Sequence, residues 1–121
     1  MISLAGETPG MTPGIEQREV DPRQKPFILK GILSPEKLAV GETLEIAAEI
    51  HSRVHPHIRV MVRFFVDGQK REETAYVIAP KAESIVTHEW QAVKGKHTIK
   101  IEVVSPAGIL YESWEKKITV K

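Results

Sequence analysis

The chain has 121 residues, with 17 Lys and Arg against 16 Asp and Glu, so its formal net charge is only +1. This length is typical of a single domain, and a near-neutral balance gives no long-range field to hold a nucleic acid or an anionic membrane. The absence of cysteine excludes disulfides, thiol catalysis and cysteine-ligated metal clusters. No apolar run approaches the roughly 18 residues of a membrane helix. We therefore expect no nucleic-acid binding, no membrane insertion by this segment and no cofactor.

Acidic and amide residues are used unevenly. Of the 16 acidic residues only Asp21 and Asp67 are aspartate, and the chain has no asparagine. Scarce Asn, Gln and Cys together with abundant Glu and Lys is a bias found in hyperthermophile proteins. The composition therefore favours a thermophilic source.

Residues 1–25 differ in composition from the rest of the chain. Thr-Pro-Gly occurs twice, at 8–10 and 12–14, and Pro22 and Pro26 follow. Pro and Gly at this density are typical of an extended or turn-rich linker, so we expect a flexible arm at 1–25. The start of the chain lacks the basic and apolar stretches of a signal peptide. Either the protein is not secreted, or the sequence is a shortened piece of a longer one.

Apolar and polar side chains alternate from Pro26 onward, as in strands with one buried and one solvent-exposed face. The clearest case is the alternation of Leu44, Ile46, Ala48 and Ile50 with Glu45, Ala47, Glu49 and His51. The pattern predicts seven strands, at about 26–33, 43–52, 58–67, 70–79, 84–92, 96–104 and 109–120. It also predicts one core between two sheets, formed by Leu44, Ile46, Ile50, Val62, Phe64, Trp90, Ile99, Ile101 and Val103.

Turn signals separate these segments at the short, even spacing of an all-β sandwich. The strongest is Asp67-Gly68, because a two-residue type I′ turn needs positive φ at both positions. No segment has the pattern of a long helix, so nothing supports the crossovers of a parallel sheet. The sequence predicts an all-β domain at 26–121 with mainly antiparallel sheets.

Four groups of residues, in order along the chain, resemble a known family. They are Gly41-x-x-Leu44-x-Ile46-x-Ala48-x-Ile50, then Val62-x-Phe64-Phe65-Val66-Asp67-Gly68, then Trp90-x-x-x-x-Gly95-x-His97-x-Ile99-x-Ile101-x-Val103, then Glu112 with Ile118-x-Val120. Over about residues 30–121 the sequence resembles the CARDB type, the cell-adhesion-related domain of bacteria and archaea. The resemblance implies an immunoglobulin-like, seven-stranded antiparallel β-sandwich, here preceded by a Pro/Gly-rich arm. It also implies a surface, adhesion or scaffold module, usually without catalysis.

The sequence departs from that family at two places. His51-Ser52 stands where the family often has Asn, and Val104-Ser105 stands where it often has Asp. No metal or polar site that depends on those residues can be transferred to this chain.

The five histidines are the candidate metal ligands. His51, His55 and His57 lie close in sequence, and two of these histidines could take part in a tetrahedral zinc site, with Glu49 or Glu89 as the candidate carboxylate. We favour the alternative of a solvated loop, because a third and a fourth ligand cannot be placed. His88 and His97 fall on predicted inward faces, where we expect hydrogen-bonded core or rim residues.

Enzymatic motifs are missing from the sequence. It contains no Gly-x-Ser-x-Gly elbow, no recognisable triad order and no glycine-rich phosphate loop in a strand–helix context. Pairs of carboxylates that could cleave a glycoside are expected by chance among 14 glutamates. We therefore predict that the protein is not an enzyme.

Large apolar and aromatic side chains are the candidates for an interaction surface. Met61 and Phe65 share the outward face of one predicted strand and could form an apolar patch that contacts a protein. The alternative is that neighbouring arginines cover them. Tyr111 and Trp114 have no settled register and could contact a protein or stack on a sugar.

These observations predict a non-catalytic interaction or spacer module of a cell-surface or extracellular protein, binding by surface complementarity. Two alternatives stay open. One is a structural assembly subunit, such as a filament or capsid-decorating protein, whose N-terminal arm adds a strand to a neighbour through Ile15 to Val20. In that case we expect an ordered arm on an oligomer, and otherwise a disordered arm on a monomer. The other alternative is an accessory carbohydrate-binding domain.

Overall fold

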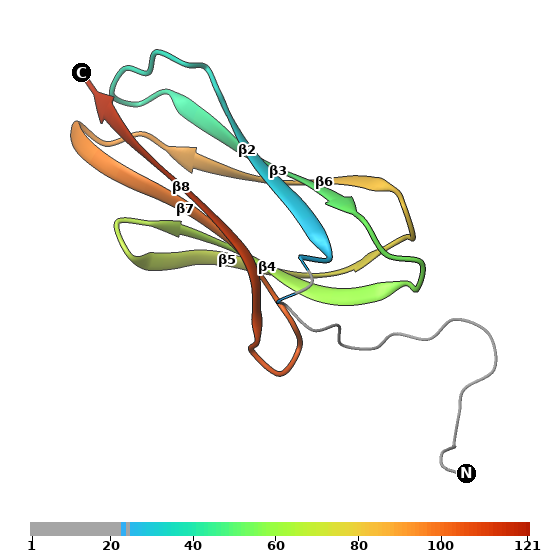
Figure 1. Ribbon diagram of the computed structural model, residues 1–121. Helices are drawn as coiled ribbons and strands as arrows, with labels where there is room; N and C mark the ends of the chain where they lie inside the picture. The colour runs from blue at the N-terminus through green and yellow to red at the C-terminus, as the bar shows by residue number, and fades with distance from the viewer. Residues whose placement is uncertain (1–22, 24) are drawn as a thin grey trace, which may run out of the picture.

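The structure is a computed structural model that describes Arg23 and residues 25–121 (Figure 1). The predicted N-terminal arm, including Ile15 to Val20, lies almost entirely outside the described residues. Its boundary at residue 25 therefore stays a prediction. From Phe27 to Val120 the described chain forms strands joined by short connections.

Seven strands follow one another along the described chain. They are β2 (Phe27–Ser34), β3 (Thr43–Ser52), β4 (Ile58–Val66), β5 (Gln69–Ile78), β6 (Glu83–Gln91), β7 (Gly95–Val104) and β8 (Leu110–Val120). Every predicted strand end lies within one residue of the observed end. The prediction succeeds because the period-two alternation is a direct consequence of strand geometry.

The strands form two antiparallel sheets that face each other (Figure 1). One sheet has the order β2-β3-β6, and the other has the order β5-β4-β7-β8. All the strand pairs within them are antiparallel. The predicted immunoglobulin-like, seven-stranded antiparallel β-sandwich is confirmed.

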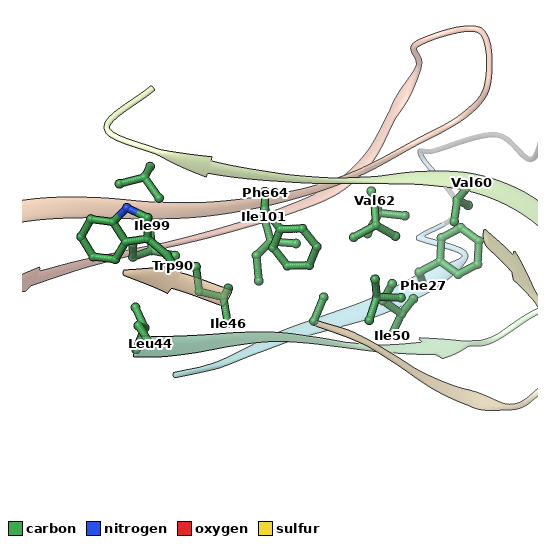
Figure 2. Packing of buried hydrophobic residues seen from close by; sticks show 14 of the residues in the cluster. Phe27, Leu44, Ile46, Ile50, Val60, Val62, Phe64, Trp90, Ile99 and Ile101 are labelled. Atoms are coloured by element: carbon green, nitrogen blue, oxygen red, sulfur yellow. The ribbon is translucent and has the colours of Figure 1, made fainter. Parts of the chain in front are cut away.

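The core fills the space between the two sheets. Figure 2 shows Leu44, Ile46 and Ile50 from β3 pointing toward Val62 and Phe64 from β4. All nine residues predicted for this core are buried. Val60, Val62 and Phe64 have no exposed surface, so the predicted register of β4 is correct. A shift of one residue would have exposed all three.

The turn at Asp67-Gly68 joins β4 to β5 as predicted. The φ angle is 53° at Asp67 and 81° at Gly68, so both residues have the left-handed conformation of a type I′ turn. The Asp67 carboxylate also accepts a hydrogen bond from the Thr98 amide at 2.9 Å. This contact ties the hairpin to β7.

Two side-chain contacts link the sheets along the open sides of the sandwich. On the β2–β8 side the Trp114 indole lies over Gly31, where an added Cβ would stand only 2.4 Å from Trp114 Cδ2. On the β5–β6 side Glu72 Oε1 bonds with His88 Nδ1, and the His88 ring also stacks on Phe64. The Gly31–Trp114 contact on one side and the His88–Glu72 contact on the other therefore join the two sheets.

Candidate interaction surface

The outer face of the four-stranded sheet carries a row of apolar side chains. Met61 on β4 lies opposite Ala75 on β5 and opposite Val104 on β7, and Val104 in turn pairs with Leu110 on β8. Val77, two residues beyond Ala75, is 38% exposed and Leu110 is 47% exposed, whereas Val104 between Met61 and Leu110 is buried at 2%. We call Met61, Ala75, Val77, Val104 and Leu110 the Met61 band. It crosses all four strands and is the apolar feature that surrounds the predicted contact residue Met61.

A charged row borders the Met61 band. Arg63, two residues after Met61 on β4, lies with its Nε 3.4 Å from Glu73 Oε2 on β5. Lys70 Nζ donates to Glu73 Oε1 at 2.6 Å, and this hydrogen bond is the main cause of a lowered pKa of the Glu73 carboxyl. Glu73 offsets one of the two cations, so the row carries a net charge of only +1 and gives the band a polar rim.

Phe65 does not join Met61 in one patch, because Arg63 and its ion pair with Glu73 lie between them. Lys100 Nζ lies 5.8 Å from the centroid of the Phe65 ring, a cation–π arrangement that places a charge over the aromatic face. Both Met61 and Phe65 are half-buried. The idea of a Met61–Phe65 pair is therefore corrected: the apolar neighbours of Met61 come from adjacent strands.

The candidate Tyr111 is not a surface residue, and its prediction as a contact residue is corrected. The β7–β8 register shifts between Val103 and Val104, so Val103 pairs with Glu112 while Val104 pairs with Leu110. Tyr111 is the extra residue at this bulge and is only 3% exposed. Its ring packs edge-on against Phe27, with centroids 5.3 Å apart.

The Trp114 side chain also packs within the sandwich. It pairs with the buried Ile101 and so faces the interior, where its ring lies against Gly31. The side chain is half-buried at the rim of the core. Neither Trp114 nor Tyr111 presents the exposed flat platform on which a sugar would stack.

The structure does not gather the three candidate metal ligands. His51 is exposed on the outer face of the three-stranded sheet, where it lies opposite Glu83 and Ile28. His55 is exposed and His57 is half-buried in the connection before β4. Over Arg23 and residues 25–121, no three His, Asp or Glu side chains are grouped so that they could hold a metal ion. The solvated-loop interpretation of His55 and His57 stays a prediction.

His88 and His97 are the inward rim residues that the sequence predicts. The His88 side chain is 16% exposed and bonds to Glu72, and that of His97 is 11% exposed and bonds to Asp67. The His97 ring also packs edge-on against Trp90, with centroids 5.0 Å apart. Both histidines are therefore hydrogen-bonded rim residues of the sandwich.

Sequence reasoning did not find Val77, Val104 and Leu110 as neighbours of Met61. Their proximity depends on the order of the strands and on the cross-strand register. The alternation within each strand indicates only which face a residue occupies. No signal within a single strand could have placed these residues side by side.

No protein-family model matches the chain, and a comparison with curated proteins finds no match. Solved structures do resemble it. The crystal structure of a CARDB domain from Pyrococcus furiosus, in complex with di-metal ions, has a TM-score of 0.60 at 17% identity, covering 78% of this chain and 85% of that one. The solution structure of the CARDB domain from the same organism has a TM-score of 0.62 at 18% identity, covering 91% of its chain. The domain is of the CARDB type in its fold.

Two further similarities are to other β-sandwich structures. The fibronectin(III)-like modules of Clostridium thermocellum CbhA have a TM-score of 0.55 at 25% identity, covering 78% of this chain and 96% of that one. A Listeria innocua β-glucosidase has a TM-score of 0.62 at 15% identity, but only 16% of its chain is covered. The similarities therefore indicate a β-sandwich module, and they give no indication of enzymatic activity.

Over Arg23 and residues 25–121, the protein contains no helix that is long and apolar enough to span a membrane.

Proposed function

We propose that this CARDB-type domain is a non-catalytic interaction or spacer module of a cell-surface or extracellular protein. The observation that carries the proposal is the Met61 band, an apolar row across the four strands of one sheet that is bordered by the charged row of Arg63, Lys70 and Glu73. Contiguous apolar patches with a polar rim often mark sites of protein contact. The proposed mechanism is surface complementarity, in which a partner covers the Met61 band.

A photocrosslinking residue in place of Met61 tests the partner surface in the cells that make the protein. The matched control carries the same residue in place of Glu89, which is exposed on the outer face of the other sheet. We expect a defined adduct from position 61 and none from position 89. Equal adduct yields from the two positions would contradict the proposal.

Localisation is tested separately by treating intact cells with protease. Cell-surface exposure predicts loss of the domain from intact cells while a cytoplasmic marker survives. Survival of the domain until the cells are lysed would rule out the surface location.

A second candidate function is a structural assembly subunit, in which the N-terminal arm adds a strand to a neighbour. The observation that favours it is that β2 and β8 are edge strands of the two sheets and lie next to each other. Deletion of residues 1–25 with measurement of the mass in solution tests this role. Loss of an oligomer would support assembly through the arm, and an unchanged monomer mass would leave the spacer role. The accessory carbohydrate-binding role has no comparable support, because the Trp114 ring packs against Gly31 and the Tyr111 ring packs against Phe27.

A further inference from the structure

The free edges of the two sheets differ in how well they are protected. A strand at a sheet edge presents unpaired backbone N–H and C=O groups that can accept another strand. Proteins block such pairing with charged side chains, bulges or inward-facing charges. Among the described residues the edge strands are β2 and β6 in one sheet and β5 and β8 in the other.

Both edges of the four-stranded sheet carry protective features. After Gln69, β5 has four charged residues in a row, Lys70 to Glu73, and its register with β4 shifts between Phe64 and Phe65. β8 contains the bulge at Tyr111, and its Lys116 lies opposite the buried Ile99 and therefore on the inward side. Bulges and inward charges of this kind disfavour an added strand.

The β6 edge of the three-stranded sheet is protected in a different way. His88 lies opposite the buried Ile46 and so on the inward side, where it bonds to Glu72 on β5. This contact holds the β6 edge against the other sheet. Glu83 and Glu89 place charges on its outer side.

β2 has the fewest of these features. Its register with β3 is unbroken from Phe27 to Ser34, and Lys30 is its one charged residue. On its outer side Ile28 is 52% exposed and Ile32 is 37% exposed. Among the edge strands of the described residues, β2 is therefore the regular strand with the fewest charges and with two exposed isoleucines.

We propose that β2 is a strand-addition surface and that the strand it accepts is β2 of a second copy of this chain. A donor strand must itself have an accessible edge, and β2 is the least charged of the described edge strands. Antiparallel pairing of two β2 strands is symmetric, so it forms a closed dimer about a two-fold axis. The two three-stranded sheets then join into one continuous sheet.

The charge of Lys30 selects the register of this dimer. A two-fold axis at Gly31 pairs Lys30 with Ile32 of the partner subunit and Leu29 with the partner's Leu33. This register keeps outward residues on one face and pairs residues 28–34 of both strands. An axis at Lys30 would instead place the two lysines directly opposite each other, which is unfavourable. The Gly31-centred register is therefore the one that β2 favours.

The dimer surface is separate from the Met61 band, which lies on the outer face of the other sheet. Failure of one proposal therefore leaves the other standing. Analytical ultracentrifugation of the full chain over a range of concentrations gives the decisive measurement. We expect a reversible monomer–dimer equilibrium, and a monomer at every concentration would overturn the inference.

Charge substitutions then test the register. Ile32→Lys places a second positive charge opposite the partner's Lys30 at two symmetric positions, so we expect the dimer dissociation constant to rise about tenfold. Adding Lys30→Glu to Ile32→Lys should restore the dimer, because opposite charges then face each other. The matched control is Ile85→Lys, at a 56% exposed isoleucine on the same outer face but on β6, and it should leave the dissociation constant unchanged.

Two outcomes of these variants would overturn the inference even if the chain dimerises. One is an equal rise of the dimer dissociation constant in Ile32→Lys and in Ile85→Lys, which would place the interface away from the β2 edge. The other is a larger rise of the dimer dissociation constant in Ile15→Lys than in Ile32→Lys, which would assign the contact to the N-terminal arm. Circular dichroism of each variant confirms that the fold is retained.

Discussion

Asp67 and His97 form a hydrogen-bonded pair at one end of the sandwich, with Asp67 Oδ2 and His97 Nδ1 2.7 Å apart. The other ring nitrogen, Nε2, lies 2.6 Å from the carbonyl oxygen of Val93. A neutral imidazole has only one N–H, so two acceptors, one at each nitrogen, favour the protonated ring. His97 thereby links the β4–β5 turn to the connection before β7.

This pair predicts a pH-dependent stability. The hydrogen bond that His97 donates to the Asp67 carboxylate is the main cause that raises the pKa of His97 above its ordinary value of 6.5. The same bond, helped by the Thr98 amide, lowers the pKa of Asp67 below 3.8. Because the pKa of His97 is raised in the folded state, the contribution of His97 to the free energy of unfolding is complete below pH 6.5. It is lost as the pH rises through the folded-state pKa of His97. The lowered pKa of Asp67 means that its contribution is present above pH 3.8 and is lost as the pH falls through the folded-state pKa.

Calorimetric melting of the chain and of its His97→Gln variant between pH 5 and pH 9 measures the effect. We expect the melting temperature of the unmodified chain to fall above about pH 6.5 and that of the variant to change less. His55→Gln, in an exposed loop, should keep the full pH dependence. An unmodified chain whose melting temperature rises over this range would contradict the protonated-ring assignment.

Gly31→Ala should destabilise the fold by about 1–3 kcal/mol, the usual cost of overpacking. The added methyl group would meet the Trp114 ring, which must then move. Urea unfolding of a double-mutant cycle with Trp114→Ala isolates the contact. In the Trp114→Ala background the cost of Gly31→Ala should largely disappear, and an unchanged cost there would show that the indole is not the cause.

Phe64→Ala should lower the free energy of unfolding by about 3–5 kcal/mol, because it leaves a cavity in the core. Phe64 has no exposed surface and also stacks on His88. The matched control is Phe65→Ala, whose half-buried ring lies on the outer face of the same strand. Urea unfolding should show a clearly smaller loss for Phe65→Ala, and equal losses would contradict the observed register of β4.

Gly68→Val should destabilise the domain by at least about 1–2 kcal/mol, because a residue with a Cβ is strained at the φ of 81°. The neighbourhood of Gly68 is open, so backbone strain alone is responsible. Gly68→Asn should cost less, since asparagine tolerates the left-handed region. If the Gly68→Asn variant melts at a lower temperature than the Gly68→Val variant, the type I′ turn is not what stabilises the β4–β5 hairpin.

The sequence by itself determined the strands, the inward register and the β4–β5 turn. Each of these depends on local chemistry: the alternation around Phe64 follows from the two-residue period of a strand, and Asp67-Gly68 follows from the φ angles of a type I′ turn. The same local reasoning identified His88 and His97 as rim residues. It could not name their partners Glu72 and Asp67, which come from distant positions in the chain.

Only the tertiary structure decided which side chains meet across strands. The bulge between Val103 and Val104 buries Tyr111, and the approach of β2 to β8 sets Trp114 against Gly31. Strand order also places Leu110 in the Met61 band and leaves the β2 edge open. The alternation in a strand specifies the face that a residue occupies but not its neighbour on that face. That neighbour is fixed by cross-strand register, which the core packing and the bulges set together.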